Sequence, residues 1–129
     1  MKSRIRNVYP ETAVLLFFEN ERAAAVTKTL EKAGLRVLVP ERSEYGKTVG
    51  CLTKLSPETE GKGSTEFPES GELIIFSGLS SKRLDTALAA LREDKLSVRF
   101  KAVVTQYNVK FTVAELLAHM LDEERKIAK

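Results

Sequence analysis

Two short apolar runs, at residues 13–18 and 73–76, constrain the fold of this chain more than any other feature of its sequence. Each run is too short for a helix and is apolar at consecutive positions, so each predicts a strand that is buried on both faces. A helical pattern and then an alternating strand pattern follow each run, with these second strands at 35–39 and 98–104. A strand, helix, strand unit is therefore predicted twice.

The predicted helices have apolar inner faces and recognisable ends. Asn20 is the expected N-cap of the first helix, and Gly34 is placed to end it. Thr112 and Glu115 form a capping box at the start of the last helix. The predicted inner faces are Ala23, Val26, Leu30 and Ala33 in the first helix, Leu84, Ala87, Leu88 and Leu91 in the second, and Val113, Leu116, Leu117, Met120 and Leu121 in the last.

These units predict one α/β domain over residues 1–129. Each helix is long enough to cross over between parallel strands, so the expected fold is a single ferredoxin-like sheet built from two β-α-β halves, 1–55 and 72–129. The additional helix at the carboxyl end is expected to cover the other face of the sheet. A further strand is predicted at 48–55. Residues 56–71, rich in Pro, Gly, Ser, Thr and Glu, are predicted to form a flexible acidic loop.

Composition excludes several classes of protein. With 129 residues, of which 43% are hydrophobic, one domain can bury a core without disulfides. No apolar run reaches transmembrane length, and the basic amino terminus lacks the apolar stretch of a signal peptide, so we expect a cytoplasmic chain with no membrane partner. One cysteine and one histidine cannot form an intrachain disulfide or the usual zinc site. We expect no metal and no cofactor.

The net charge of +3 only weakly supports nucleic-acid binding, because the charge is unevenly distributed along the chain. Lys2, Arg4 and Arg6 make the amino-terminal tail basic, whereas the 56–71 segment is acidic. The remaining charges are mixed in sign along the predicted helices. The sequence therefore does not outline a phosphate-binding face.

The sequence contains no catalytic signature. It has no glycine-rich phosphate loop, no His-Glu-x-x-His pair and no Gly-x-Ser-x-Gly elbow. His119, the one histidine, falls toward the outer side of the last helix and is predicted to be a surface residue. Cys51 lies in an apolar stretch and is predicted to be a buried, inert thiol. We therefore assign no catalytic residue.

The candidate binding site is the junction at 101–111, where a strand ends and a helix begins. Lys101, Thr105, Asn108 and Phe111 are its candidate residues. Helix starts offer unpaired N–H groups, and a lysine from the preceding strand could join them in holding a carboxylate or phosphate. The alternative is purely structural. Asn108 would then shape the turn, and Lys101 would lie on a solvated face with its stem packed on Phe111.

A second candidate is the stretch that contains Tyr45, Gly46, Lys47 and Gly50. Its glycines indicate turns in the first place. Because a tyrosine and a lysine flank them, these residues could also form part of a binding rim.

The second half of the chain resembles a known family. From Leu73 to Leu121, the sequence is similar to the bacterial domain of unknown function family 3783, and the likeness extends to an apolar strand, a helix and a later apolar stretch in the first half. Lys101, Thr105 and Asn108 match the typical motif of this family. The chain departs from the family at 106–107, where Gln-Tyr replaces Pro-Thr, and at Phe111, where tryptophan is common. The resemblance implies no activity.

Three functional hypotheses follow from these features. The first is a small non-enzymatic binding or regulatory module that takes a protein partner or a small anionic ligand at 101–111, with homodimerisation along an open sheet edge as a further possibility. The second is an RNA-binding or ribonucleoprotein-associated domain that presents Tyr107 or Phe111 for stacking. The third is an enzyme that uses Lys101, which would have to be withdrawn from water.

Overall fold

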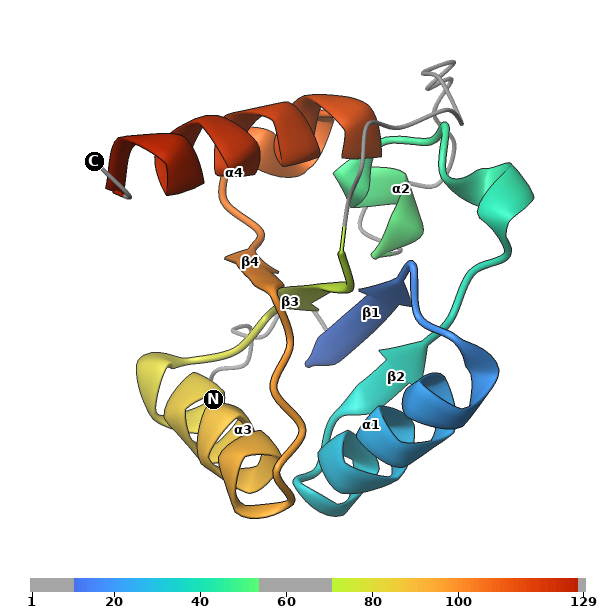
Figure 1. Cartoon of the computed structure of the whole chain (residues 1–129), viewed down its shortest axis with the longest axis vertical. Coiled ribbons are helices and arrows are strands. Elements are labelled where there is room, and N and C mark those ends of the chain that lie inside the picture. The colour runs from blue at the N-terminus through green and yellow to red at the C-terminus, as the bar shows by residue number, and fades with distance from the viewer. Residues whose placement is uncertain (1–10, 54–70, 128–129) are drawn as a thin grey trace, which may run out of the picture.

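The computed structural model describes residues 11–53 and 71–127, in which a four-stranded sheet lies between two layers of helices (Figure 1). The strands are β1 (Thr12–Leu16), β2 (Arg36–Leu38), β3 (Leu73–Ser77) and β4 (Phe100–Val103). Helices α1 (Asn20–Lys32) and α3 (Ser81–Glu93) cover one face, and α2 (Val49–Leu52) and α4 (Val113–Ile127) cover the other. The α/β class, the four strands and the covering role of the last helix are as the sequence predicts.

The strand order is β2-β1-β3-β4. β1 is parallel to β2 and β3 is parallel to β4, as crossover connections through α1 and α3 require, whereas β1 and β3 are antiparallel. The ferredoxin-like detail of the prediction is not confirmed. In a split β-α-β unit another strand lies between the two parallel strands, but here each parallel pair is directly hydrogen-bonded.

The core is divided into two parts by the central strands. Every residue of β1 and β3 is buried, and alternate side chains point to opposite faces of the sheet. Toward α2 and α4 the buried cluster includes Val14, Leu16, Leu73, Ile75, Val113 and Leu117. Toward α1 and α3 it includes Ala13, Leu15, Val26, Leu30, Ile74, Phe76, Ala87 and Leu91. The predicted inner faces of all three long helices are therefore confirmed.

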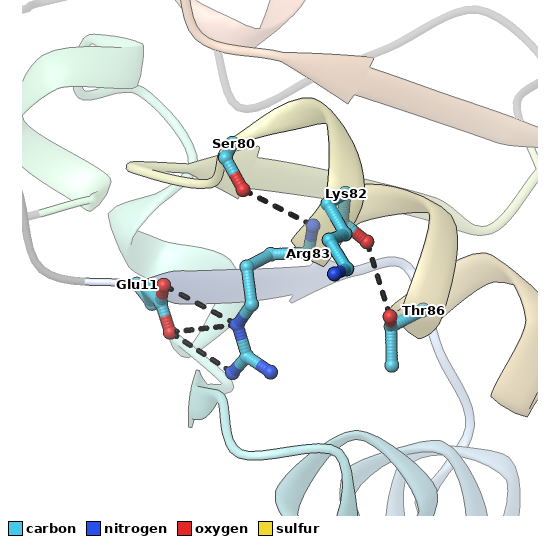
Figure 2. A network of polar contacts seen from close by, with 5 residues as sticks. All are labelled: Glu11, Ser80, Lys82, Arg83 and Thr86. Carbon is cyan, nitrogen blue, oxygen red and sulfur yellow. Dashed lines mark hydrogen bonds and ion pairs between the residues drawn. The ribbon is translucent and has the colours of Figure 1, made fainter.

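Two ion pairs join the halves reciprocally. Arg83 of α3 binds Glu11 next to β1, with Nη2 and Oε1 2.9 Å apart (Figure 2). Arg22 of α1 binds Glu72 next to β3, with Nη2 and Oε1 2.6 Å apart. The same number of residues separates Glu11 from Glu72 and Arg22 from Arg83, so both pairs use equivalent positions. Reciprocal contacts of this kind indicate a two-fold axis that relates the halves.

The register of the sheet shows where this two-fold axis passes through the structure. The middle pair of the antiparallel ladder is Val14 with Ile75, and these residues have the same spacing along the chain as the equivalent ion-pair residues. α1 and α3 are each 13 residues long and begin at equivalent positions. After β2 and β4 each half continues through a 3₁₀ turn, η2 (Arg42–Glu44) or η3 (Asn108–Lys110), into a further helix. The chain therefore contains two equivalent β-α-β units that meet along β1 and β3.

Both crossover helices end in the same left-handed motif. The residue after the C-cap is Gly34 in the first half, with φ +96°, and Lys95 in the second, with φ +59°. In both halves the N–H of this residue and the next N–H donate to carbonyl groups of the last turn, at 2.9 and 3.1 Å after α1 and at 3.0 and 2.9 Å after α3. A Cβ on Gly34 would lie 2.6 Å from Nη2 of Arg83. Glycine therefore also makes room for an interhalf ion pair.

Two local predictions are wrong. The strand predicted at 48–55 is the short helix α2 in its described part, because Oγ1 of Thr48 accepts a hydrogen bond from the N–H of Cys51 and caps a helical turn. Val49 also donates its N–H to the carbonyl oxygen of Phe111 (2.8 Å), which holds the segment against the sheet's face. The N-cap of α1 is Glu19, which makes no side-chain cap bond, and Asn20 is the first helical residue.

Some predictions lie outside the described residues. These are the basic tail, the end of the 48–55 strand, and the flexible acidic loop at 56–71 except for Gly71. Within the described ranges, no helix has both the length and the apolar character needed to cross a membrane.

Gly34 and Lys95 occupy equivalent positions, and substitutions at them are expected to change the free energy of unfolding in opposite directions. Gly34→Ala should lower the free energy of unfolding by about 1–2 kcal/mol, because alanine resists positive φ and its Cβ meets Arg83. Lys95→Gly should raise it by about 0.5 kcal/mol, because the left-handed conformation suits glycine. Guanidinium denaturation of both variants measures these changes. Effects of the same sign would contradict the equivalence of the two turns.

Candidate functional site

Four hydrogen bonds fix the turn that follows β4. The side-chain amide of Asn108 accepts from the N–H of Thr105 (2.9 Å) and donates to the carbonyl oxygen of Val103 (3.1 Å). The hydroxyl oxygen of Thr105 accepts from the N–H groups of Tyr107 and Asn108, both at 3.1 Å. Thr105 and Asn108 are therefore brought together, and each satisfies the polar groups of the other. The structural alternative considered for Asn108 is the arrangement observed.

The Asn108 amide also covers the outer edge of the sheet. β4 is an edge strand, and the N–H of Val104 donates inward to the carbonyl oxygen of Phe76. The carbonyl group of Val103 and the N–H of Thr105 therefore face outward. If a parallel strand were added at this edge, one of its residues would form hydrogen bonds with both of these groups, through its N–H and its carbonyl oxygen. By bonding both, Asn108 blocks strand addition at this end of the edge.

The same turn displays an exposed aromatic side chain. Tyr107 is 75% exposed, and Val103 at the end of β4 is 41% exposed. Both belong to the turn that Thr105 and Asn108 hold together. The junction therefore presents apolar surface on a fixed backbone.

Phe111 lies at the end of η3 and is half-buried against the core beneath α4. Its ring stacks on the ring of His119, with centroids 4.9 Å apart and planes at 12°. His119 is exposed, as the sequence predicts. The capping box is also confirmed, because Thr112 and Glu115 exchange hydrogen bonds of 2.9 and 3.3 Å at the start of α4. Phe111 and His119 thus fasten the junction to α4.

Lys101 belongs to a different environment. Its side chain is exposed, and Nζ donates to the carbonyl oxygen of Val98 at 3.1 Å. It shares no hydrogen bond with Thr105 or Asn108, and it borders a groove between α3 and β4. The four candidate residues therefore lie in three separate places. Thr105 and Asn108 lie in the turn, Phe111 stacks on His119, and Lys101 lines the groove.

Tyr45, the second candidate from the sequence, is buried and acts on the β1 to α1 turn. Its hydroxyl oxygen accepts a hydrogen bond of 2.9 Å from the N–H of Phe17, and the two rings meet edge to face at 4.9 Å. The guanidinium of Arg42 lies over both rings. Gly46 is buried beside Tyr45, and Gly50 lies inside α2 rather than in a turn. Lys47 pairs with Glu44 at 3.5 Å.

Sequence reasoning missed Phe17. This residue has φ +67°, which an aromatic residue adopts only under constraint. Its equivalent in the second half is Gly78, with φ +79°. Alignment of the two halves would have found this position. The hollow beside Phe17 and Tyr45, at the carboxyl ends of β1 and β2, has a volume of about 630 Å³.

Two ionisable groups that form ion pairs, Arg22 and Glu124, have shifted pKa values. The hydrogen bond to Glu72 raises the pKa of Arg22. The hydrogen bond from Arg99 holds the pKa of the Glu124 carboxyl below its usual value, at an Nη2 to Oε1 distance of 2.9 Å. Because the pKa of Glu124 is lower in the folded chain, this link to α4 is present above the unfolded pKa and is lost as pH falls through the folded pKa.

The described residues offer no cluster of three His, Cys, Asp or Glu side chains that could hold a metal ion. Cys51 is half-buried, whereas the sequence predicts a buried thiol. It lines a shallow hollow together with Leu38 and Lys47. The other residues of α2, Val49, Gly50 and Leu52, are buried, so Cys51 is the residue of this helix that remains partly open to solvent.

Comparison with a family model agrees with the resemblance found in the second half of the sequence. Residues 72–127 match the family described as a domain of unknown function, DUF3783. The match begins beside β3 and ends with α4, so it corresponds to one of the two structural halves. No curated protein and no solved structure is detectably similar to the chain.

The roles of the Asn108 amide can be separated by substitution. Asn108→Ala removes two hydrogen bonds and should lower the free energy of unfolding by about 1–2 kcal/mol. Asn108→Asp keeps the acceptor for Thr105 but loses the donor to Val103, so its effect should be about half as large. Urea denaturation of both variants measures the difference. Equal losses would show that the two bonds do not act separately.

Proposed function

We propose that the chain is a small, cytoplasmic, non-enzymatic module that binds a protein partner through the turn at 103–108. One observation carries the proposal: Tyr107 is 75% exposed on a backbone that four hydrogen bonds hold in place. Tyrosine is enriched among the residues that dominate binding energy at protein interfaces. A large exposed aromatic on a fixed turn has the properties of an interface anchor.

The fixed turn lowers the entropic cost of binding. Ordering a mobile segment on association consumes part of the interaction energy, and a turn that is already ordered avoids this. Thr105 and Asn108 are positioning residues in this proposal, because their bonds end within the turn. Phe111 supports the turn from below through its contact with the core. Val103, 41% exposed, extends the apolar contact area next to the turn.

The nature of the partner is constrained by charge. Lys110 follows the turn and is exposed, and the turn at 103–108 contains no acidic residue. A partner whose contact surface is apolar at its centre and acidic at its rim would complement this surface. A second copy paired along β4 is less favoured, because Asn108 already occupies the outward groups of Val103 and Thr105.

RNA binding is the second candidate function, and the exposure of Tyr107 is the observation that favours it. RNA binding has less support than protein binding, because the Phe111 ring is already stacked on His119 on one face. Tyr107 is then the better available residue of the junction for stacking on a base. A titration with fluorescent single-stranded RNA at low ionic strength separates the candidates. Absence of binding there would eliminate RNA.

An enzyme that uses Lys101 has the least support. Such a lysine would have to be withdrawn from water, whereas the Lys101 side chain is exposed and donates to a backbone carbonyl group. No catalytic base or nucleophile that could act with it is identified at the junction.

Partner binding through the turn predicts a selective loss. In cross-linking pull-downs quantified by mass spectrometry, Tyr107→Ser should reduce recovery of the bound protein by about tenfold or more, because a hot-spot side chain contributes roughly 2 kcal/mol. Val39→Ser is the matched control, since Val39 is 52% exposed and follows β2 at the opposite edge of the sheet. It should leave recovery unchanged. Equal recovery by both variants would exclude the turn as the binding surface.

A further inference from the structure

A groove between α3 and β4 has an apolar floor. Its volume is about 470 Å³, within the usual size range of small-molecule sites. The floor consists of Leu88, Leu91, Leu96 and Val98. Leu91 and Val98 are buried, whereas Leu88 and Leu96 are half-buried and so remain open to a ligand. Lys101 stands at the β4 side.

Three cations surround this floor. Arg92, Lys95 and Lys101 line the groove, all three are exposed, and none of the described carboxylate side chains lines it with them. None of the three forms an ion pair with another described residue. Three unneutralised positive charges around an apolar surface repel one another and attract an anion. We call this surface the basic groove.

The end of a helix accounts for only part of this charge. The last carbonyl groups of α3 favour cations nearby, which gives Arg92 and Lys95 a structural reason to be there. Lys101 comes from β4 and is not explained in this way. Its Nζ uses one of three donors on the Val98 carbonyl group, which holds the ammonium group at the groove with donors to spare.

The first half of the chain provides an internal control. By the spacing that relates the two halves, the equivalents of Leu88, Arg92 and Lys95 are Thr27, Glu31 and Gly34. The fold therefore does not require an apolar residue or cations at these positions. Their combination is a property of the second half alone.

We infer that the basic groove binds a small acid with a hydrocarbon body, such as a medium-chain carboxylate. The apolar part would cover the half-buried surface of Leu88 and Leu96, and the carboxylate would be bound by Lys101 and Arg92 at the rim. Neither part of the ligand is sufficient alone. A simple anion leaves the apolar floor exposed to water, and a neutral hydrocarbon leaves the three cations without a counter-charge.

This site is independent of the turn that carries Tyr107. Its residues come from the end of α3 and the start of β4, whereas the turn follows the end of β4. The Tyr107→Ser variant is therefore expected to bind the acid as the wild type does. If protein binding at the turn is excluded, acid binding in the groove can still be tested, and the reverse also holds.

The test is a nuclear magnetic resonance titration of the ¹⁵N-labelled full chain with decanoate, decanol and acetate. Decanoate should bind at least tenfold more tightly than either of the other two, with shifts centred on residues 88–101. Lys101→Glu should weaken decanoate binding by about tenfold, and added salt should also weaken it. Lys82→Glu is the matched control, because it makes the same charge change on an exposed lysine at the other end of α3. It should leave binding unchanged.

A second variant removes the groove without removing the fold. Leu88→Thr, Arg92→Glu and Lys95→Gly, made together, install the residues that the first half carries at equivalent positions. This triple variant should keep a dispersed spectrum and lose decanoate binding. Decanol binding as tightly as decanoate, shifts outside residues 88–101, or undiminished binding by the folded triple variant would each overturn the inference.

Discussion

The antiparallel pairing of β1 with β3 is the interaction on which the rest of the structure depends. Both strands are buried on both faces, and their apolar residues, 13–16 and 73–76, contribute alternately to the two core clusters. The pairing also brings Glu11 to Arg83 and Glu72 to Arg22. Without it, the edges of β1 and β3 that now pair with each other would be open to water. Neither half has a complete core alone.

The two-fold relation explains where the halves differ. Most buried positions in the central strands are apolar in both halves, because the packing of the sheet requires it; the buried Thr12 and Ser77, which face each other at one end of the ladder, are polar. Surface positions are free of this constraint, and there the second half carries Arg92 and Lys95 in place of Glu31 and Gly34. The same comparison identifies Phe17, which occupies a left-handed position that Gly78 fills in the other half. Where the two halves carry different residues at equivalent positions, the requirements of the fold therefore do not explain the residue that is present.

The sequence predicts the parts of the fold that local patterns determine. The apolar runs, the helical stripes and the capping box at Thr112 all depend on neighbouring residues, and all are present. The pairing of β1 with β3 could not be predicted, because a pattern of buried strands does not specify their order. The grouping of the candidate site residues could be predicted only in part, for a related reason. Sequence proximity placed Lys101 with Thr105 and Asn108, but the structure gives Lys101 a separate partner in Val98.

Native-state hydrogen exchange tests the dependence on the central pair most directly. If β1 and β3 join two equivalent units into one cooperative structure, their amides at Val14 and Ile75 should exchange with the same free energy, equal to that of global unfolding. Amides at the ends of β2 and β4, the two edge strands, should exchange more easily. Exchange in β1 at a much lower free energy than in β3 would contradict the account, because the second half would then be stable without the first.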